Sequence, residues 1–136
     1  YRAAIRIFPR LLKKHPENNR IAYYLGTAYG EKGDVEKAVT ILSKINPQSP
    51  FFSRAIVQQS QLLREAHREP EAIHLLEKAI KKNPNIPESY LALSTLLRVN
   101  NQFSKAKQVM DEALSLFPEN GDVYFEAGVV YDRLKD

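Results

Sequence analysis

Cysteine is absent from the 136 residues, which excludes disulfides, thiolate catalysis and cysteine-ligated metal sites. Five glycines and eight prolines are too few for a low-complexity chain. No apolar run approaches the roughly 20 residues that a membrane-spanning helix needs. The composition, 43% hydrophobic and 26% charged, is that of a soluble globular protein. The missing cysteine leaves the compartment open, because cysteine-free proteins occur in both reducing and oxidising settings.

The sequence also lacks an initiator methionine and a visible signal peptide. It begins at Tyr1 inside a predicted helix, so we interpret it as a segment of a longer protein, which leaves an upstream signal or anchor open. Charge of one sign is scarce at each end. Residues 1–20 hold six basic side chains and one acidic one, whereas residues 111–136 hold seven acidic and two basic ones. Nucleic-acid binding is disfavoured, because it calls for one continuous basic face.

Positions 34 residues apart carry similar residues along the whole chain, without insertion. Seven columns share this step, and such a period is the mark of a repeat architecture. The columns are Pro16, Pro50, Pro84 and Pro118; Ala4, Ala38, Ala72 and Ala106; Phe8, Leu42, Leu76 and Met110; Leu11, Ile45, Ala79 and Ala113; Leu25, Gln59, Leu93 and Ala127; Gly26, Ser60, Ser94 and Gly128; and Tyr29, Leu63, Leu97 and Tyr131.

Each 34-residue unit reads as two helices, because apolar residues recur at steps of three and four between the prolines. In the first full unit we expect helices over about 20–32 and 35–45. Gly33 lies between them at a position that needs positive φ, and Asp34 follows as the predicted N-cap. Later units place His67 and Asn101 at the position of Gly33. We expect Ser49 to be an N-cap with Pro50 at the first helical position.

These columns resemble the tetratricopeptide repeat family, in which Leu-Gly and Tyr mark the first helix, and Ala, an aromatic, Ala and Pro mark the second. The best match runs through Leu25-Gly26, Tyr29, Gly33, Ala38, Leu42 and Pro50. The resemblance implies an all-α solenoid, a right-handed superhelix of antiparallel helix pairs. It divides the chain into a half repeat at 1–18, repeats at 19–52, 53–86 and 87–120, and a half repeat at 121–136.

The resemblance also implies that the first helices line a concave groove that binds a peptide or protein segment. The groove residues that follow from the period are Arg20, Tyr23, Thr27, Arg54, Val57, Gln61, Arg64, Leu91, Thr95, Arg98, Phe125 and Val129. Some family members hold a C-terminal carboxylate with Lys and Asn on successive first helices. In this chain Tyr23 and Thr27 replace the first Lys and Asn, Gln58 replaces the next Asn, and Glu88 and Ala92 replace the last basic pair. We therefore expect no such clamp.

Enzymatic chemistry is not indicated by any cluster in the sequence. His15, His67 and His74 lack the i, i+4 spacing of a helical zinc site, and we expect them on the surface. Asp111 and Glu112 point about 100° apart on a helix, which suits a solvated face better than acid–base catalysis. We therefore predict no catalytic residue, metal, cofactor or small-molecule substrate.

One hypothesis is that an enzyme lies elsewhere in the parent chain and that this segment recruits its substrate. Two other functions concern this segment itself. The leading one is a protein-binding scaffold. The alternative is head-to-tail self-assembly, because the chain begins with a second-type helix and ends with a first-type helix. Other copies of the chain would then be the partner, through the end residues Ala4, Phe8, Leu11, Val123, Tyr124, Ala127 and Tyr131.

Overall fold

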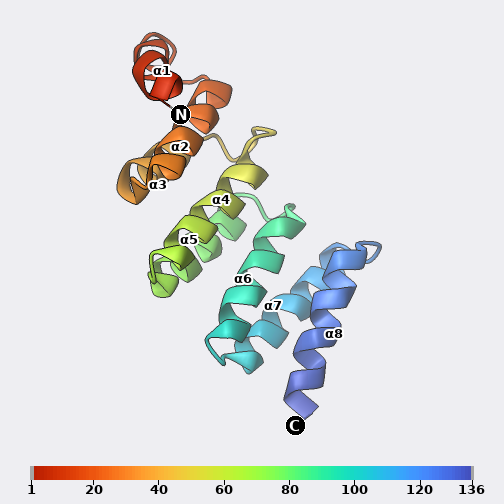
Figure 1. The fold of residues 1–136 in the computed structure, drawn as a ribbon. Coiled ribbons are helices and arrows are strands. Elements are labelled where there is room, and N and C mark those ends of the chain that lie inside the picture. The colour runs from red at the N-terminus through yellow and green to blue at the C-terminus, as the bar shows by residue number, and fades with distance from the viewer. Residues whose placement is uncertain (1, 136) are drawn as a thin grey trace. The chain divides into compact units, whose positions relative to one another are not determined.

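The computed structural model describes residues 2–135, and this part of the chain consists of helices without a strand. The helices are α1 (Arg2–Lys14), α2 (Asn19–Lys32), α3 (Val35–Leu42), α4 (Phe52–Glu65), α5 (Glu69–Lys82), α6 (Pro87–Val99), α7 (Phe103–Leu116) and α8 (Gly121–Lys135) (Figure 1). The all-α prediction is confirmed. Tyr1 and Asp136, the outer limits of the predicted half repeats, lie outside the described residues. None of the helices in residues 2–135 is long and apolar enough to span a membrane.

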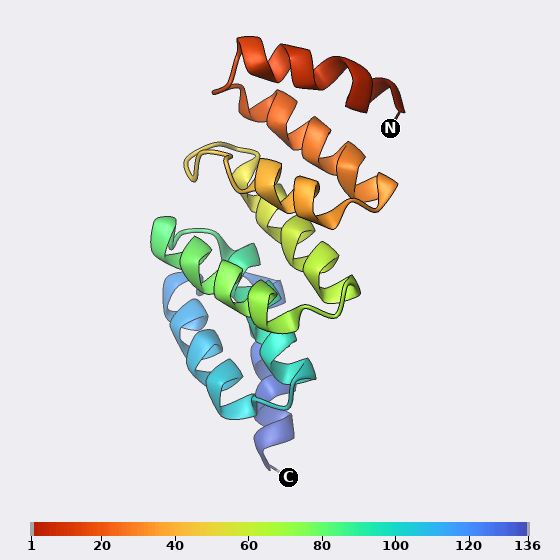
Figure 2. The same cartoon turned by 90° about the vertical axis from the view of Figure 1, so that its left-hand side faces the viewer.

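The chain forms two compact units, residues 1–68 and residues 69–136. In the first unit, α2 packs against α1, α3 and α4, and α3 packs against α4. Helix α1 contacts α2 and no other helix of this unit, so it forms an edge with one side open (Figure 2). In the second unit, α6 packs against α5, α7 and α8, and α7 also packs against α8. Each unit is thus built from antiparallel neighbours in chain order.

The columns of the 34-residue period form the buried side of the second-type helices. Ala38, Ala72 and Ala106 are fully buried, as are Leu42, Leu76 and Met110 four positions later. Within the small column, Gly26 has the close-packing role that its residue type suggests, whereas Gly128 is exposed. A Cβ on Gly26 would lie 2.6 Å from Cγ and Cδ2 of Leu42, so α3 approaches α2 as closely as a glycine permits.

Three helices end in the same left-handed turn, at Gly33 (φ 93°), His67 (φ 59°) and Asn101 (φ 60°). In each, this residue donates its N–H to the carbonyl three residues back, and the next residue donates to the carbonyl five residues back. This is the Schellman pattern, which satisfies the last carbonyls of a helix. The predicted role of Gly33 is confirmed, and so is Asp34 as N-cap, with its side chain accepting from Lys37 N at 3.2 Å.

His67 pays a conformational cost at this position that Gly33 avoids. We expect His67→Gly to raise the free energy of unfolding by about 1 kcal/mol, because the left-handed region costs an L-residue roughly that much. Urea unfolding followed by circular dichroism measures the change. His67→Ala is the matched control, since it removes the imidazole but keeps the Cβ, and it should bring no gain. An equal rise in the free energy of unfolding for both variants would show that the imidazole, and not the left-handed backbone, destabilises the parent chain.

The loop between α3 and α4 differs from the sequence prediction. Helix α3 ends at Leu42, three residues short of the expected limit, and α4 begins only at Phe52. Ser49 is not the N-cap of α4, so that prediction was wrong. Its Oγ accepts instead from Phe51 N at 3.1 Å, in a turn that precedes the helix. Pro47 and Pro50 both lie in this segment, and proline lacks the N–H that a continuing helix uses.

Candidate partner-binding surfaces

In the first unit, the predicted groove residue Tyr23 belongs to an aromatic cluster. Its ring centroid lies 5.4 Å from that of Phe51 and 5.7 Å from that of Tyr24. Phe8 of α1 joins the cluster through Tyr24, at 6.4 Å. The Arg20 guanidinium lies 6.0 Å from the Tyr24 centroid, within the range of a cation–π contact. Tyr23 is half-buried, so part of its ring packs against its neighbours and part is accessible on the surface.

Thr27, the next predicted groove residue, faces α4. Its Oγ1 lies 3.0 Å from Gln58 Oε1 and 2.8 Å from its own helix carbonyl at Tyr23. From the sequence, Gln58 was interpreted only as a replacement for a clamp asparagine, and this contact was not predicted. The Thr27 hydroxyl and the Gln58 side-chain amide are bonded to each other. Family members with a carboxylate clamp have donors at such positions that bond to the ligand instead. This pairing supports the prediction that the clamp is absent.

The remaining predicted groove residues of the first unit lie on α2 and α4. Arg20, Arg54, Gln61 and Arg64 are exposed, and Val57 is half-buried between them. Arg20, Arg54 and Arg64 form no ion pair in the described part of the chain. This surface is therefore basic and carries a small apolar centre.

In the second unit, the predicted floor residues lie on the neighbouring helices α6 and α8. Leu91, Thr95 and Val129 are half-buried, and the Thr95 hydroxyl donates to Leu91 O at 2.9 Å. Phe125 is 76% exposed, the most open large apolar side chain of the described residues. Leu91 and Phe125 occupy the same position in successive repeats, and we expect the two helices to present one apolar strip.

Arg98 was predicted as a groove cation, but its charge is already matched. Its Nε donates to Glu126 Oε2 at 3.1 Å, and one of its terminal nitrogens lies 3.4 Å from Glu126 Oε1. The Ser94 hydroxyl donates to the same carboxylate at 2.9 Å, and Glu126 is only 8% exposed. Glu126 was not predicted, because its column holds Tyr24, Gln58 and Ala92 and therefore shows no shared character. The network links α6 to α8.

The predicted end residues on α8 divide into two groups. Val123 and Ala127 are buried within the second unit, whereas Tyr124 and Tyr131 are exposed. The Tyr131 hydroxyl donates to Asp111 of α7, and Lys107 donates to the same carboxylate at 2.8 Å. Hydrogen bonds from Lys107 and Tyr131 lower the pKa of Asp111, while the bond to Asp111 raises the pKa of Tyr131. The exposed end face of α8 is thus narrower than predicted.

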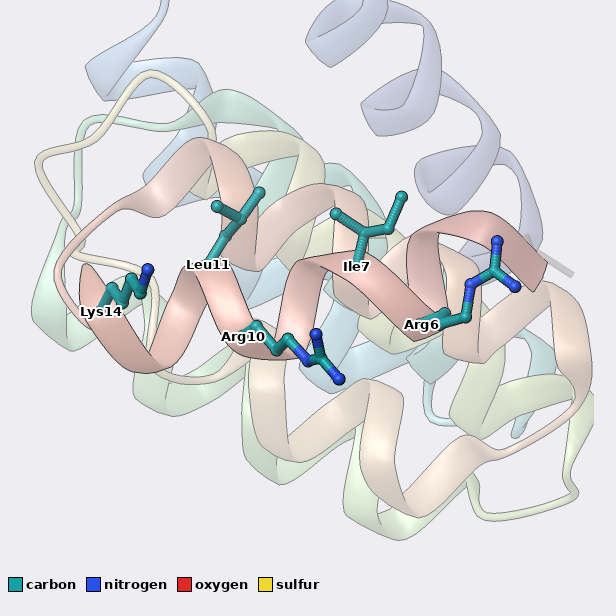
Figure 3. Close-up of a pocket in the computed structure, with 5 residues that line it drawn as sticks. All are labelled: Arg6, Ile7, Arg10, Leu11 and Lys14. Atoms are coloured by element: carbon teal, nitrogen blue, oxygen red, sulfur yellow. The ribbon is translucent and has the colours of Figure 1, made fainter.

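The predicted end residues on α1 lie at the edge of the first unit. Ala4 and Phe8 are half-buried, and Leu11 is exposed beside Ile7. Ile7 and Leu11 lie side by side on α1, with Arg6, Arg10 and Lys14 along the adjoining side of the helix (Figure 3). These five residues line an open hollow of about 350 Å³. The edge is an apolar stripe with a basic border.

The described residues show no group of three or more potential metal ligands. His15, His67 and His74 are exposed, as predicted, and so are Asp111 and Glu112. Buried polar side chains include Ser94 and Glu126 of the network with Arg98, and Gln59, which donates to the Val39 carbonyl at 3.1 Å.

Comparison with known proteins places the chain among repeat proteins of one family. The chain is 29% identical over 117 residues to the TPR repeat-containing protein YpiA of Bacillus subtilis, covering 86% of this chain and 27% of that protein. It is 27% identical over 133 residues to the BBSome complex member BBS4 homolog of Drosophila melanogaster, covering 94% of this chain and 27% of that protein. The chain thus spans about a quarter of the length of these relatives.

Solved structures share the fold. A crystal structure of MamA superposes with a TM-score of 0.70 at 22% identity, covering 96% of this chain and 77% of that one. The first TPR of Spaghetti (RPAP3), bound to the HSP90 peptide SRMEEVD, gives a TM-score of 0.66 at 15% identity, covering 87% of this chain and 96% of that one. The family model described as "Tetratricopeptide repeat" matches residues 1–57 and 63–127. The chain belongs to the tetratricopeptide repeat family.

Proposed function

We propose that this chain is a non-catalytic scaffold that binds a peptide or protein segment along its first-type helices. The observation that carries the proposal is the open strip on α6 and α8, where Phe125 is 76% exposed beside the half-buried Leu91 and Val129. Exposed apolar surface of this kind marks interaction sites. The RPAP3 domain with the same fold is bound to a peptide, which supports the class of ligand.

Charge and aromatic content define the segment that we expect to bind. On α2 and α4, three exposed arginines, Arg20, Arg54 and Arg64, surround Tyr23 and Val57. On α6 and α8 the strip is apolar, and Arg98 of α6 is neutralised by Glu126. The expected ligand is an acidic segment with apolar anchor residues. An HSP90-type C-terminal tail is not proposed, because Thr27 and Gln58 are bonded to each other.

Phe125→Ala should weaken binding at least tenfold without lowering stability, since an exposed aromatic contributes contact area to a ligand and little to the fold. The measurement selects peptides from a displayed random library on the parent chain and compares dissociation constants by fluorescence anisotropy. Tyr124→Ala is the matched control, because Tyr124 is 54% exposed on the same helix but points about 100° away. It should leave affinity unchanged.

A second variant tests both units together. Tyr23→Ala, Arg54→Glu and Leu91→Ala should abolish capture of the selected peptides, while circular dichroism shows retained helix content. Peptides that bind this triple variant as well as the parent would show that the groove assignment is wrong. Equal losses from Phe125→Ala and Tyr124→Ala would place the binding surface elsewhere on α8.

A further inference from the structure

The loop between α3 and α4 places an aromatic residue at a position that is polar in the other repeats. Phe51 stands there, whereas the same position holds Glu17, Asn85 and Glu119 along the rest of the chain. The Phe51 ring is half-buried, and its centroid lies 5.4 Å from that of Tyr23 at an interplanar angle of 34°. The polar residues elsewhere show that stacking of the repeats does not require an aromatic side chain at this position.

Two arginines of the first unit lie where a helix dipole disfavours a cation. Arg20 is in the first turn of α2 and Arg54 in the first turn of α4, and neither turn contains an acidic residue. The first turn carries partial positive charge, so a cation there lowers helix stability. The same position holds Glu88 in α6 and Asp122 in α8, the charge that the dipole favours. Helix stability therefore does not account for the two arginines.

Both arginines border the aromatic pair. Arg20 and Tyr23 are three residues apart on α2 and so share one face of the helix. The Arg20 guanidinium lies 6.0 Å from the Tyr24 centroid, and that ring lies 6.4 Å from Phe51. Arg54 follows Phe51 by three residues, at the start of the neighbouring helix. Packed helices lie about 8–10 Å apart, so long side chains at the same position of α2 and α4 can reach one ion between them.

We propose that this surface binds a phosphotyrosine side chain, with its ring against Tyr23 and Phe51 and its phosphate between Arg20 and Arg54. The inference rests on the proposed function and names the anionic group that the first unit takes from the bound segment. A phosphate monoester carries about −1.5 to −2 charge at neutral pH, which matches two guanidinium groups. A single carboxylate would leave one of them unmatched. Arginine also forms charge-assisted hydrogen bonds to phosphate oxygens, and aromatic rings gain from contact with each other.

The surrounding residues supply little competing negative charge. Residues 37–64 contain four basic side chains and no acidic one, and residues 1–30 contain six basic side chains and one acidic one. Arg20 and Arg54 are exposed, and neither forms an ion pair within residues 2–135. Aromatic rings beside arginines also suit single-stranded nucleic acid. The next positions along the two helices, Thr27 and Gln61, are uncharged, which favours one anionic group over a chain of phosphates.

Four degenerate peptide libraries test the chemistry of the ligand. Their central residue is fixed as phosphotyrosine, tyrosine, phosphoserine or glutamate, and fluorescence anisotropy measures the affinity of each for the parent chain. We expect the phosphotyrosine library to bind at least tenfold more tightly than the other three, because each of those lacks the ring or the dianion. Equal affinity for phosphotyrosine and phosphoserine would overturn the proposal. Tighter binding of a single-stranded oligonucleotide than of the phosphotyrosine library would also overturn it.

Variants test the residues. Arg20→Ala and Arg54→Ala should each lower the preference for phosphotyrosine over tyrosine at least tenfold. Lys32→Ala is the matched control, because it removes the same charge from the exposed opposite end of α2, and it should leave the preference unchanged. Phe51→Leu keeps an apolar side chain in the loop and should lower the preference for phosphotyrosine over phosphoserine. A preference that survives both arginine substitutions, in variants with the parent's circular dichroism, would overturn the site.

Phenyl phosphate separates this site from the peptide groove, since it has the ring and the phosphate of phosphotyrosine but no backbone. Nuclear magnetic resonance of the arginine Nε–H groups follows its binding, and we expect the signals of Arg20 and Arg54 to shift together. Such shifts without binding of any peptide library would support the site and contradict the peptide groove. Peptide binding without phosphotyrosine preference, and without shifts at either arginine, would overturn this inference and leave the proposed function intact.

Discussion

Gly26→Ala should destabilise the chain by about 2 kcal/mol, whereas Gly128→Ala, at the same position of another repeat, should stabilise it by about 1 kcal/mol. The Gly26 Cβ would lie 2.6 Å from Leu42 Cγ, and Leu42 is only 1% exposed, so neither group has room to move. Overpacking of this kind costs roughly 1–3 kcal/mol. At Gly128 the space is open, and alanine gains about 1 kcal/mol in helix propensity over glycine.

Urea unfolding of both variants measures whether each substitution lowers or raises the free energy of unfolding. The double variant Gly26→Ala with Leu42→Ala identifies the cause. Leu42→Ala alone should cost about 3 kcal/mol by leaving a cavity. In the double variant the new methyl group enters that cavity, so the combined loss should be smaller than the sum of the single losses by at least about 1 kcal/mol. Strict additivity would mean that the two side chains do not meet.

This pair of glycines also shows what the sequence was able to predict. The period alone assigned Gly26 and Gly128 to one column and explained both by close helix packing. That explanation holds for Gly26, because α3 follows it in the same unit. It does not describe Gly128, because no helix among the described residues covers it. A shared residue type at positions 34 residues apart predicts the packing of a position that has helices on both sides. It does not tell which of those neighbouring helices are present.

The candidate site was less predictable than the fold for a similar reason. Regular positions could be assigned from the period, since Tyr23, Val57, Leu91 and Phe125 follow from one register, and their role in binding stays a prediction. Contacts between unlike columns were not found. Phe51 lies in an irregular loop, and its ring contact with Tyr23 depends on the turn after Ser49, where the predicted cap was wrong. Such contacts depend on side-chain length and loop path, which hydrophobic periodicity does not record.

Glu126→Ala should destabilise the second unit by about 3 kcal/mol, because it removes the partner of Arg98 and of the Ser94 hydroxyl at once. Breaking a buried ion pair from one side costs roughly 3–5 kcal/mol. The lower end is expected here, since the Arg98 side chain is 28% exposed and water partly replaces its partner. Glu126→Gln keeps an acceptor for both donors but loses the charge, so its loss should be about half as large.

The double variant Arg98→Leu with Glu126→Leu tests whether the loss reflects an unmatched charge or lost packing. It should be within about 1 kcal/mol of the parent, because replacing both members of a buried pair with apolar residues is often neutral. The Ser94 hydroxyl then bonds back to its own helix, as serine does within helices. A loss as large as that of Glu126→Ala would show that packing around the pair dominates.

Arg98 and Arg54 differ in whether their positive charge is available to a bound peptide. Both were predicted as groove cations, but Arg98 is held by Glu126 while Arg54 is exposed and forms no ion pair in the described part of the chain. Arg98→Leu should therefore lower stability and leave peptide affinity unchanged when binding is measured well below the melting temperature. Arg54→Leu should do the reverse, weakening acidic peptides and reducing the salt dependence of binding. If Arg98→Leu weakens acidic peptides as much as Arg54→Leu does, Glu126 releases Arg98 when the ligand binds.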